Sequence, residues 1–202
     1  MIKPAIINVR IQAKGKLSQL CLEQGIEDLQ GVVDHLRSLP YGRTSEKRNL
    51  ALVMEEGRGT CSAKHAFLAQ LAFENGVRGL HLALCTYNIT ESTHHEAKAI
   101  LKHYGLKAIP EARCFIKYKN NIYNLVGRQL PKQPEIMSDI EIAPLQVASF
   151  KKRYHKNYIE NWLRIERIHK RWSPEQIWSI REECIEAAEE NWESCPRLLC
   201  CA

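Results

Sequence analysis

A glycine-rich turn that opens directly into an apolar helix constrains this chain more than any other stretch. Residues 57–76 begin with Gly57 and Gly59, and Thr60 is a good N-cap because its hydroxyl can accept a hydrogen bond from a free amide of the first turn. Gly76 marks the expected end of the helix, because glycine adopts the left-handed conformation at low cost. Apolar residues lie on most sides of the segment, so the sequence predicts a helix that is buried on most of its faces.

Cys61 lies on the first turn of this predicted helix, and its position permits two interpretations. The free amides and the positive end of the helix dipole favour the thiolate form, which lowers the pKa of a cysteine. Gly57 and Gly59 let a ligand approach the backbone closely, and amides there can face a developing oxyanion. Alternatively, Cys61 is a small core residue, because free cysteine is among the most buried residue types.

The length and composition are those of an ordinary globular protein. The chain has 202 residues, of which 45% are hydrophobic and 26% are charged, and this suits one domain or one domain with a helical appendage. No long apolar segment opens the chain, and no run approaches the roughly 18 apolar residues of a transmembrane helix. We therefore expect a cytoplasmic protein without a transmembrane segment; the sequence does not predict its oligomeric state.

The eight cysteines do not form a metal-binding pattern. No C-x-x-C pair occurs, so the sequence predicts neither a zinc site nor any other cofactor. The absence of a secretory signal argues against a disulfide framework. Three cysteines, Cys195, Cys200 and Cys201, cluster in the last residues, and the sequence assigns them no role.

Hydrophobic periodicity and turn signals predict the elements around the central helix. They indicate helices over 26–39 and 95–104, a polar loop over 43–49 and a buried strand over 80–87.

A hairpin is predicted after the second of these helices. Residues 111–119 and 122–127 alternate in polarity around Asn120-Asn121, and asparagine tolerates the positive φ of a two-residue turn. This register places Lys117 opposite Asn124.

Three segments of the chain resemble the transglutaminase-like branch of papain-like folds, which includes the arylamine N-acetyltransferases. Residues 59–66 look like the nucleophile turn of that family, residues 109–116 like the strand that carries its histidine, and residues 122–125 like the strand that carries its aspartate. The resemblance covers roughly residues 50–130. It implies an α+β core, in which a buried helix with an N-terminal cysteine packs on an antiparallel sheet, with Cys, His and Asp in that order along the chain.

The resemblance implies that Cys61 is the nucleophile, but the two other family positions are occupied by Arg113 and Asn124. Asparagine can orient an imidazole in papain-like enzymes. Arginine stays protonated and cannot take a proton from a thiol, although its charge can hold Cys61 as a thiolate. His65 lies four residues after Cys61 on the same helix face and is an alternative partner for the sulfur. We expect it to border the ligand together with Gly59 and Thr60.

The last quarter of the chain predicts a helical hairpin. An aromatic stripe runs through 150–172; eight basic and two acidic residues lie in 151–172, and seven glutamates and one arginine lie in 173–193. A basic helix followed by an acidic one most simply forms an ion-paired antiparallel hairpin. Nucleic-acid binding through 151–172 is the less favoured interpretation.

We therefore predict three parts: a transglutaminase-like core over 1–145, a C-terminal helical extension over 146–194 and a cysteine-containing tail over 195–202. The favoured function is that of a degenerate relative which binds a peptide or a small acyl or amide ligand at Cys61 and turns it over poorly or not at all. An active cysteine-dependent acyltransferase or amide hydrolase is the first alternative, and a nucleic-acid-binding module is the second.

Overall fold

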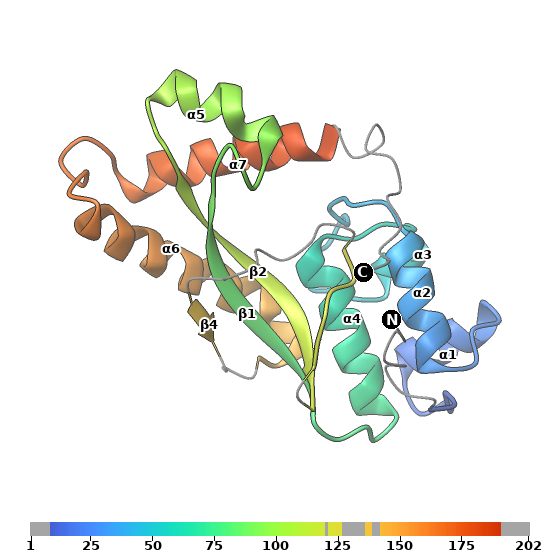
Figure 1. The fold of residues 1–202 in the computed structure, drawn as a ribbon. Coiled ribbons are helices and arrows are strands. Elements are labelled where there is room, and N and C mark those ends of the chain that lie inside the picture. Colours follow the sequence, from blue (N-terminus) through green and yellow to red (C-terminus); the bar gives the residue numbers. More distant parts are fainter. Residues whose placement is uncertain (1–8, 120, 127–135, 139–141, 191–202) are drawn as a thin grey trace.

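The chain has an α+β fold, in which helices cover both faces of a four-stranded antiparallel sheet of order β3-β2-β1-β4 (Figure 1). The computed structural model describes residues 9–119, 121–126, 136–138 and 142–190. In chain order the elements are α1 (Lys16–Glu23), α2 (Leu29–Ser38), α3 (Leu52–Glu55), α4 (Cys61–Glu74), β1 (Leu80–Ile89), the short 3-10 helix His95–Ala97, α5 (Lys98–Tyr104), β2 (Ile109–Tyr118), β3 (Asn121–Tyr123), β4 (Ile136–Ser138), the 3-10 helix Pro144–Gln146, α6 (Val147–Ile165) and α7 (Pro174–Glu190).

The long pair of β1 and β2 is the centre of the sheet. Its register runs from Leu80 opposite Tyr118 to Ile89 opposite Ile109, whereas β3 pairs only with residues 116–118 of β2. Among the described strands, none covers the outer edge of β2 before residue 116. The outward-facing backbone groups of that edge must therefore be satisfied by other parts of the chain, because unpaired buried groups are costly.

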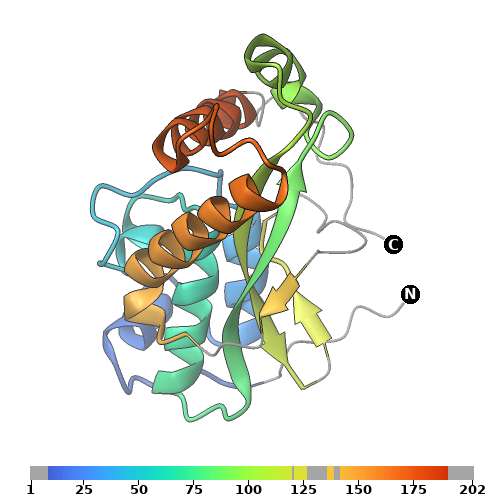
Figure 2. The ribbon, with the colours of Figure 1, turned by 90° about the vertical axis from the view of Figure 1, so that its left-hand side faces the viewer.

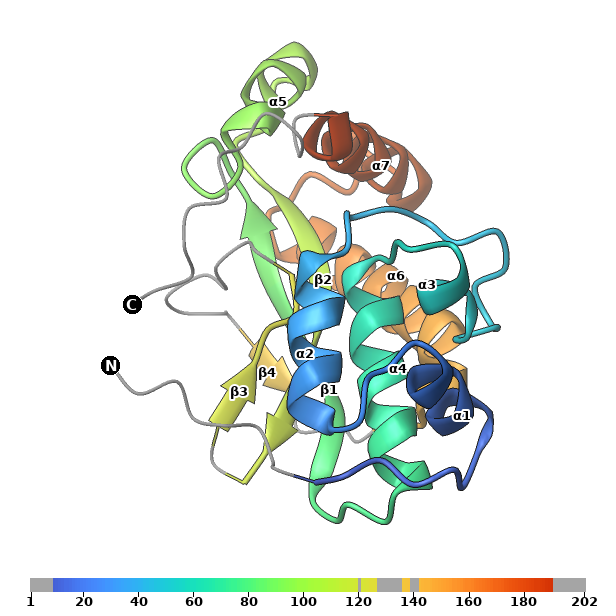
Figure 3. The same cartoon turned by 90° about the vertical axis from the view of Figure 1, so that its right-hand side faces the viewer.

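Side chains of β1 alternate between two hydrophobic cores. Leu82 and Leu84 face the core formed with α1, α2 and α4, which lie on one side of the sheet (Figure 3). Ala83, Cys85 and Tyr87 face the core formed with α5, α6 and α7 (Figure 2). Burial on both faces explains why this strand is a continuous apolar run in the sequence.

The predicted central helix is confirmed as α4. Thr60 is its N-cap, with a side-chain oxygen that accepts the Ala63 N–H at 3.3 Å, and Gly76 follows its end with φ of 70°. The helix predicted over 26–39 begins only at Leu29, because the Asp28 side chain accepts the Gly31 N–H at 2.7 Å and so caps it there.

The predicted hairpin exists, but its predicted register is wrong. Tyr118 pairs with Asn121 and Lys117 pairs with Ile122. Lys119 adopts the left-handed conformation with φ of 52°, so the chain turns earlier than expected and Asn121 already belongs to β3. Asn124, predicted opposite Lys117, consequently lies beyond the end of the strand.

The C-terminal helices lie side by side and pack through apolar side chains. Ile159 and Trp162 of α6 share a buried cluster with Ile177, Ile180 and Cys184 of α7. Among the described side chains, no ion pair links α6 with α7, and the prediction of an ion-paired hairpin is therefore wrong in this respect. Apolar contact supplies the packing instead.

Both C-terminal helices also contact β2, so they belong to the structure around the sheet. The predicted division at residues 145 and 194 stays a prediction, and the tail over 195–202 lies outside the described residues. In the described part of the chain, no helix is long and apolar enough to cross a membrane.

Candidate functional site

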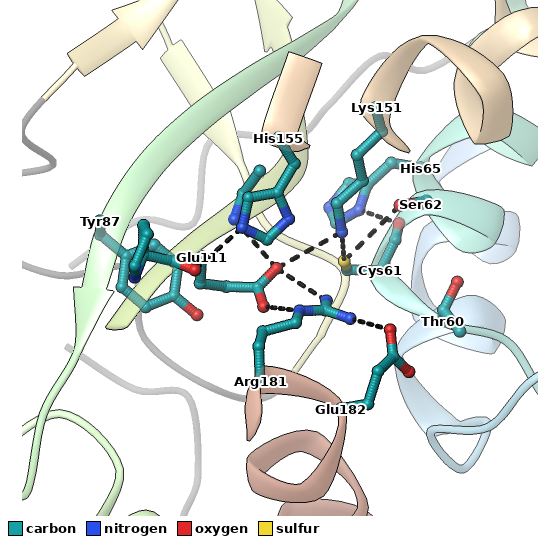
Figure 4. A network of polar contacts seen from close by, with 12 residues as sticks. Thr60, Cys61, Ser62, His65, Tyr87, Glu111, Lys151, His155, Arg181 and Glu182 are labelled. Atoms are coloured by element: carbon teal, nitrogen blue, oxygen red, sulfur yellow. Dashed lines mark hydrogen bonds and ion pairs between the residues drawn. The ribbon is translucent and has the colours of Figure 1, made fainter. Parts of the chain in front are cut away.

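Cys61 lies where the N-terminus of α4 meets the open edge of β2. The backbone N–H of Cys114 donates to the Cys61 sulfur. Further along this edge, the Ala112 N–H donates to Glu111 Oε1 at 3.0 Å, and Nε2 of His155 donates to the Pro110 carbonyl at 2.9 Å. Side chains thus satisfy the edge that no described strand covers, and they bring α4, β2 and α6 together (Figure 4).

A chain of charged groups begins at the Cys61 sulfur. Lys151 Nζ lies 3.9 Å from this sulfur and 3.6 Å from Glu111 Oε1. Arg181 of α7 binds both oxygens of Glu111, with Nε to Oε2 at 2.5 Å and Nη2 to Oε1 at 2.9 Å (Figure 4). This bidentate pair is buried, with 9% of the Arg181 side chain and 4% of the Glu111 side chain exposed.

This series of charged groups ends at a more exposed ion pair. Arg181 Nη1 also donates to Glu182 Oε1 at 2.7 Å, and Glu182 in turn pairs with Arg43. The pair of Arg43 and Glu182 adds no net charge to the site.

Neighbouring positive charges lower the pKa of Cys61. Burial alone would raise this pKa, but the charges of Lys151 and Arg113 and the Cys114 N–H outweigh burial. For Lys151 itself burial would lower the pKa, yet the negative charges of Cys61 and Glu111 raise it, so the ammonium form is retained. The charges of Lys151 and Arg113 act on Cys61 in addition to the position of its sulfur at the N-terminus of α4, and the activated thiol stays a prediction.

Arg113 is almost completely buried, with 6% exposure, and its charge acts on Cys61, Tyr41 and Tyr87. Within the described ranges, no carboxylate lies at ion-pair distance from this guanidinium. The two tyrosines have raised pKa values, chiefly because burial disfavours the phenolate. Both therefore remain neutral hydroxyls, and the surroundings of Arg113 are rich in hydrogen-bond donors.

His65 cannot act as the base for Cys61, because both of its ring nitrogens are occupied. Its Nε2 accepts the Leu125 N–H at 2.9 Å, which leaves Nδ1 protonated to donate to the Cys61 carbonyl at 2.5 Å. Burial lowers the pKa of His65 to about 3, so the ring stays neutral. The ring links α4 to the segment after β3, and the proposed partnership of His65 with the sulfur is wrong.

Asn124 forms hydrogen bonds with Val126 and Arg37. Its Oδ1 accepts the Val126 N–H at 3.1 Å, and its carbonyl accepts Nε and Nη2 of Arg37 at 3.4 and 3.3 Å. The first of these contacts is a local turn formed by an asparagine side chain. No described contact joins Asn124 to Cys61 or to an imidazole, so the orienting role is a family expectation that this geometry does not support.

The turn glycine has a packing role. A Cβ on Gly59 would lie 2.9 Å from Lys64 Cγ, and the Gly59 N–H donates to the Pro40 carbonyl at 3.3 Å. This amide is therefore not directed at a ligand. Lys64 is fully buried and donates to the Leu39 carbonyl at 2.6 Å, and burial lowers its pKa to about 8.

Sequence reasoning missed three residues of the site, namely Lys151, Glu111 and Arg181. Two of them had a signal: Arg181 is the only basic residue in the acidic stretch 173–193, and Glu111 is the only acidic residue in the predicted strand 111–119. A lone charge in such a place calls for a partner of opposite sign. Lys151 had no such signal, because it is one of eight basic residues in its segment.

Comparison of the chain with protein-family models, with curated proteins and with solved structures finds no match. Within the described residues, no group of three or more histidine, cysteine, aspartate or glutamate side chains is arranged to hold a metal ion.

Proposed function

We propose that this chain is a transglutaminase-like protein with a papain-like core, which binds an anionic ligand through Arg113 beside Cys61 and does not turn over amides. The order α4, β1, β2, β3 supports the proposed core, with a cysteine on the first turn of the buried helix. The observation that carries the proposed function is the buried guanidinium of Arg113, which has no carboxylate partner among the described residues.

The charges of the site favour a negatively charged ligand. Arg113 and Arg181 are buried cations and the Lys151 side chain is only 15% exposed, whereas Glu111 and a Cys61 thiolate are the buried anions that face them. Positive charge therefore exceeds negative charge by at least one, even when the thiol is ionised. A buried charge without a partner is costly, and a carboxylate accepts hydrogen bonds from guanidinium in a fixed geometry.

The same groups are poorly suited to amide turnover. A thiolate can attack a carbonyl, but an amine leaving group needs an acid that gives up its proton near neutral pH. The raised pKa values of Arg113 and Lys151 make them weak acids, and His65 is committed to the backbone. Lys64 has a pKa of about 8, but its ammonium group donates to the Leu39 carbonyl. Among the described groups, none is therefore free to give a proton to the leaving amine.

A second candidate function is acyl transfer from activated donors such as esters of good leaving groups. The observation that favours it is the lowered pKa of Cys61. A leaving group that departs as an anion needs no acid, so the missing proton donor would not prevent formation of an acyl–cysteine.

Two measurements on wild-type protein and on Arg113→His and Arg113→Met test the proposal. Calorimetric titration with acetate, succinate and inorganic phosphate should show binding to the wild-type protein and a clear loss in both variants. Incubation with p-nitrophenyl acetate and with a peptide amide measures acyl transfer. Binding by wild type with no amide cleavage by any of the three proteins supports the proposal. A gain of amide cleavage in Arg113→His would instead identify a dormant triad, and equal anion binding by all three proteins would refute the role of Arg113.

We do not extend the proposal to nucleic acid. Lys151 is buried in the site, and three other cations of this stretch lie over aromatic rings: Arg153 on Phe150, Lys156 on Trp178 and Arg171 on Trp172.

A further inference from the structure

Three buried cysteines lie near one another on α4 and the two central strands. Cys61 is on the helix, Cys114 is on β2, and Cys85 is on β1 opposite Arg113. The charges of the three thiols influence one another. A thiolate that is close to further thiols is the arrangement that redox-active pairs use.

Cys114 is the partner that the geometry favours for Cys61. Its backbone N–H donates to the Cys61 sulfur. The Ser62 hydroxyl contacts both sulfurs, and it lies 3.9 Å from the Cys61 sulfur. Cys114 also faces the core that contains α4, whereas Cys85 faces the opposite core. The Cys85 side chain therefore points to the opposite face of the sheet from that of Cys114.

We propose that Cys61 and Cys114 form a thiol pair that hydroperoxides oxidise to a disulfide. In the first step the Cys61 thiolate attacks one oxygen of hydrogen peroxide, the O–O bond breaks, and Cys61 sulfenic acid and hydroxide form. In the second step the Cys114 sulfur attacks the sulfenic sulfur, the S–O bond breaks, and the Cys114 proton leaves with the hydroxyl group as water. The thiols lose two electrons in total and the peroxide gains them.

The division of roles follows from the surroundings of each sulfur. Lys151 Nζ lies 3.9 Å from Cys61 and stabilises its thiolate, which is the form that reacts with peroxide. Burial raises the pKa of Cys114 to about 12 and that of Cys85 to about 11, so these two remain thiols. Cys61 is accordingly oxidised first, and Cys114 resolves the sulfenic acid. The inference concerns thiol chemistry and does not depend on the proposed anion binding.

Peptide mapping of the full chain tests the proposal, because trypsin places the three cysteines in separate peptides. Cleavage after arginine and lysine yields residues 59–64 with Cys61, residues 79–98 with Cys85 and residues 114–117 with Cys114. The protein is treated with hydrogen peroxide, free thiols are alkylated, and the digest is analysed by mass spectrometry without reduction. We expect a disulfide between 59–64 and 114–117 that disappears after reduction.

Two variants separate the roles of the neighbouring cysteines. Cys114→Ser should lose the disulfide and should leave Cys61 as a sulfenic acid that dimedone traps in peptide 59–64. Cys85→Ser, the matched control from the same sheet, should retain the disulfide of the wild-type protein. A wild-type digest in which 59–64 stays reduced, or is joined to 79–98 or to the tail cysteines instead, would overturn the proposal whatever the variants show.

Discussion

Replacing Glu111 by glutamine tests whether the buried ion pairs of Glu111 with Arg181 and Lys151 stabilise the fold. The substitution keeps the size of the side chain but removes the charge that faces Arg181 and Lys151. Because the Glu111 side chain is only 4% exposed, the two cations would lose their partner where water cannot replace it. Breaking a buried ion pair by removing one partner costs about 3–5 kcal/mol, and we expect a loss of this size in the free energy of unfolding.

The matched control is Glu91→Gln, which removes the same charge from an exposed ion pair. Glu91 pairs with Lys98, and both side chains are 61% exposed. An exposed pair contributes about 0–1 kcal/mol, so this variant should remain close to wild type. Urea unfolding followed by the fluorescence of the four tryptophans measures both losses. If Glu111→Gln lowers the free energy of unfolding no more than Glu91→Gln does, the buried ion pairs of Glu111 do not stabilise the fold.

Further predictions concern pH, labelling and packing. Because the pKa of Glu111 is lowered in the folded protein, its ionised carboxylate contributes fully to the free energy of unfolding above about pH 4.3, the pKa of an unperturbed glutamate. This stabilisation is lost as the pH falls below this value, so the free energies of unfolding of wild type and Glu111→Gln should converge at lower pH. His65 has a folded pKa of about 3 against 6.5, so its neutral ring stabilises the fold above pH 6.5 and this stability falls by up to about 1.4 kcal/mol per pH unit towards pH 3; His65→Gln should flatten the slope of unfolding free energy over that window. Lys151→Met should shift the pH of half-maximal iodoacetamide labelling of Cys61 upward, and an unchanged profile would contradict thiolate stabilisation by Lys151. Gly59→Ala should lower the midpoint of urea unfolding by an amount that corresponds to about 1–3 kcal/mol, because its methyl group meets the Lys64 stem at 2.9 Å.

The central helix was predictable because its signals are local. Thr60 and Gly76 mark its two ends within the segment itself, and capping depends on groups only a few residues away. The turn between β2 and β3 was less predictable, although it is also local. Asparagine is the better candidate for a left-handed residue, yet Lys119 takes that conformation, and the register follows the residue that turns.

The site was predictable only in part, because it is assembled from four distant segments. Cys61 was found through its helix and Arg113 through its place in the strand. Lys151 and Arg181 come from α6 and α7, and only the packing of these helices on β2 brings them to Glu111. His65 shows the opposite error, since a spacing of four residues suggested contact with the sulfur, whereas the ring bonds to the Cys61 carbonyl.

The site as a whole holds charge in fixed positions, and this property distinguishes it from a site that transfers protons. Proton transfer needs a group whose pKa lies near the working pH. The pKa of Glu111 is lowered, and those of Arg113 and Arg181 are raised, so all three move away from neutrality. The raised pKa of Lys151 has the same effect, and of these five groups only Cys61 has a pKa that moves towards neutrality. Lys64, whose pKa is lowered to about 8, donates to the Leu39 carbonyl. A lone thiolate among permanent charges can be paired, acylated or oxidised, but it cannot pass a proton to a leaving group, which is why the geometry favours ligand binding and thiol oxidation over hydrolysis.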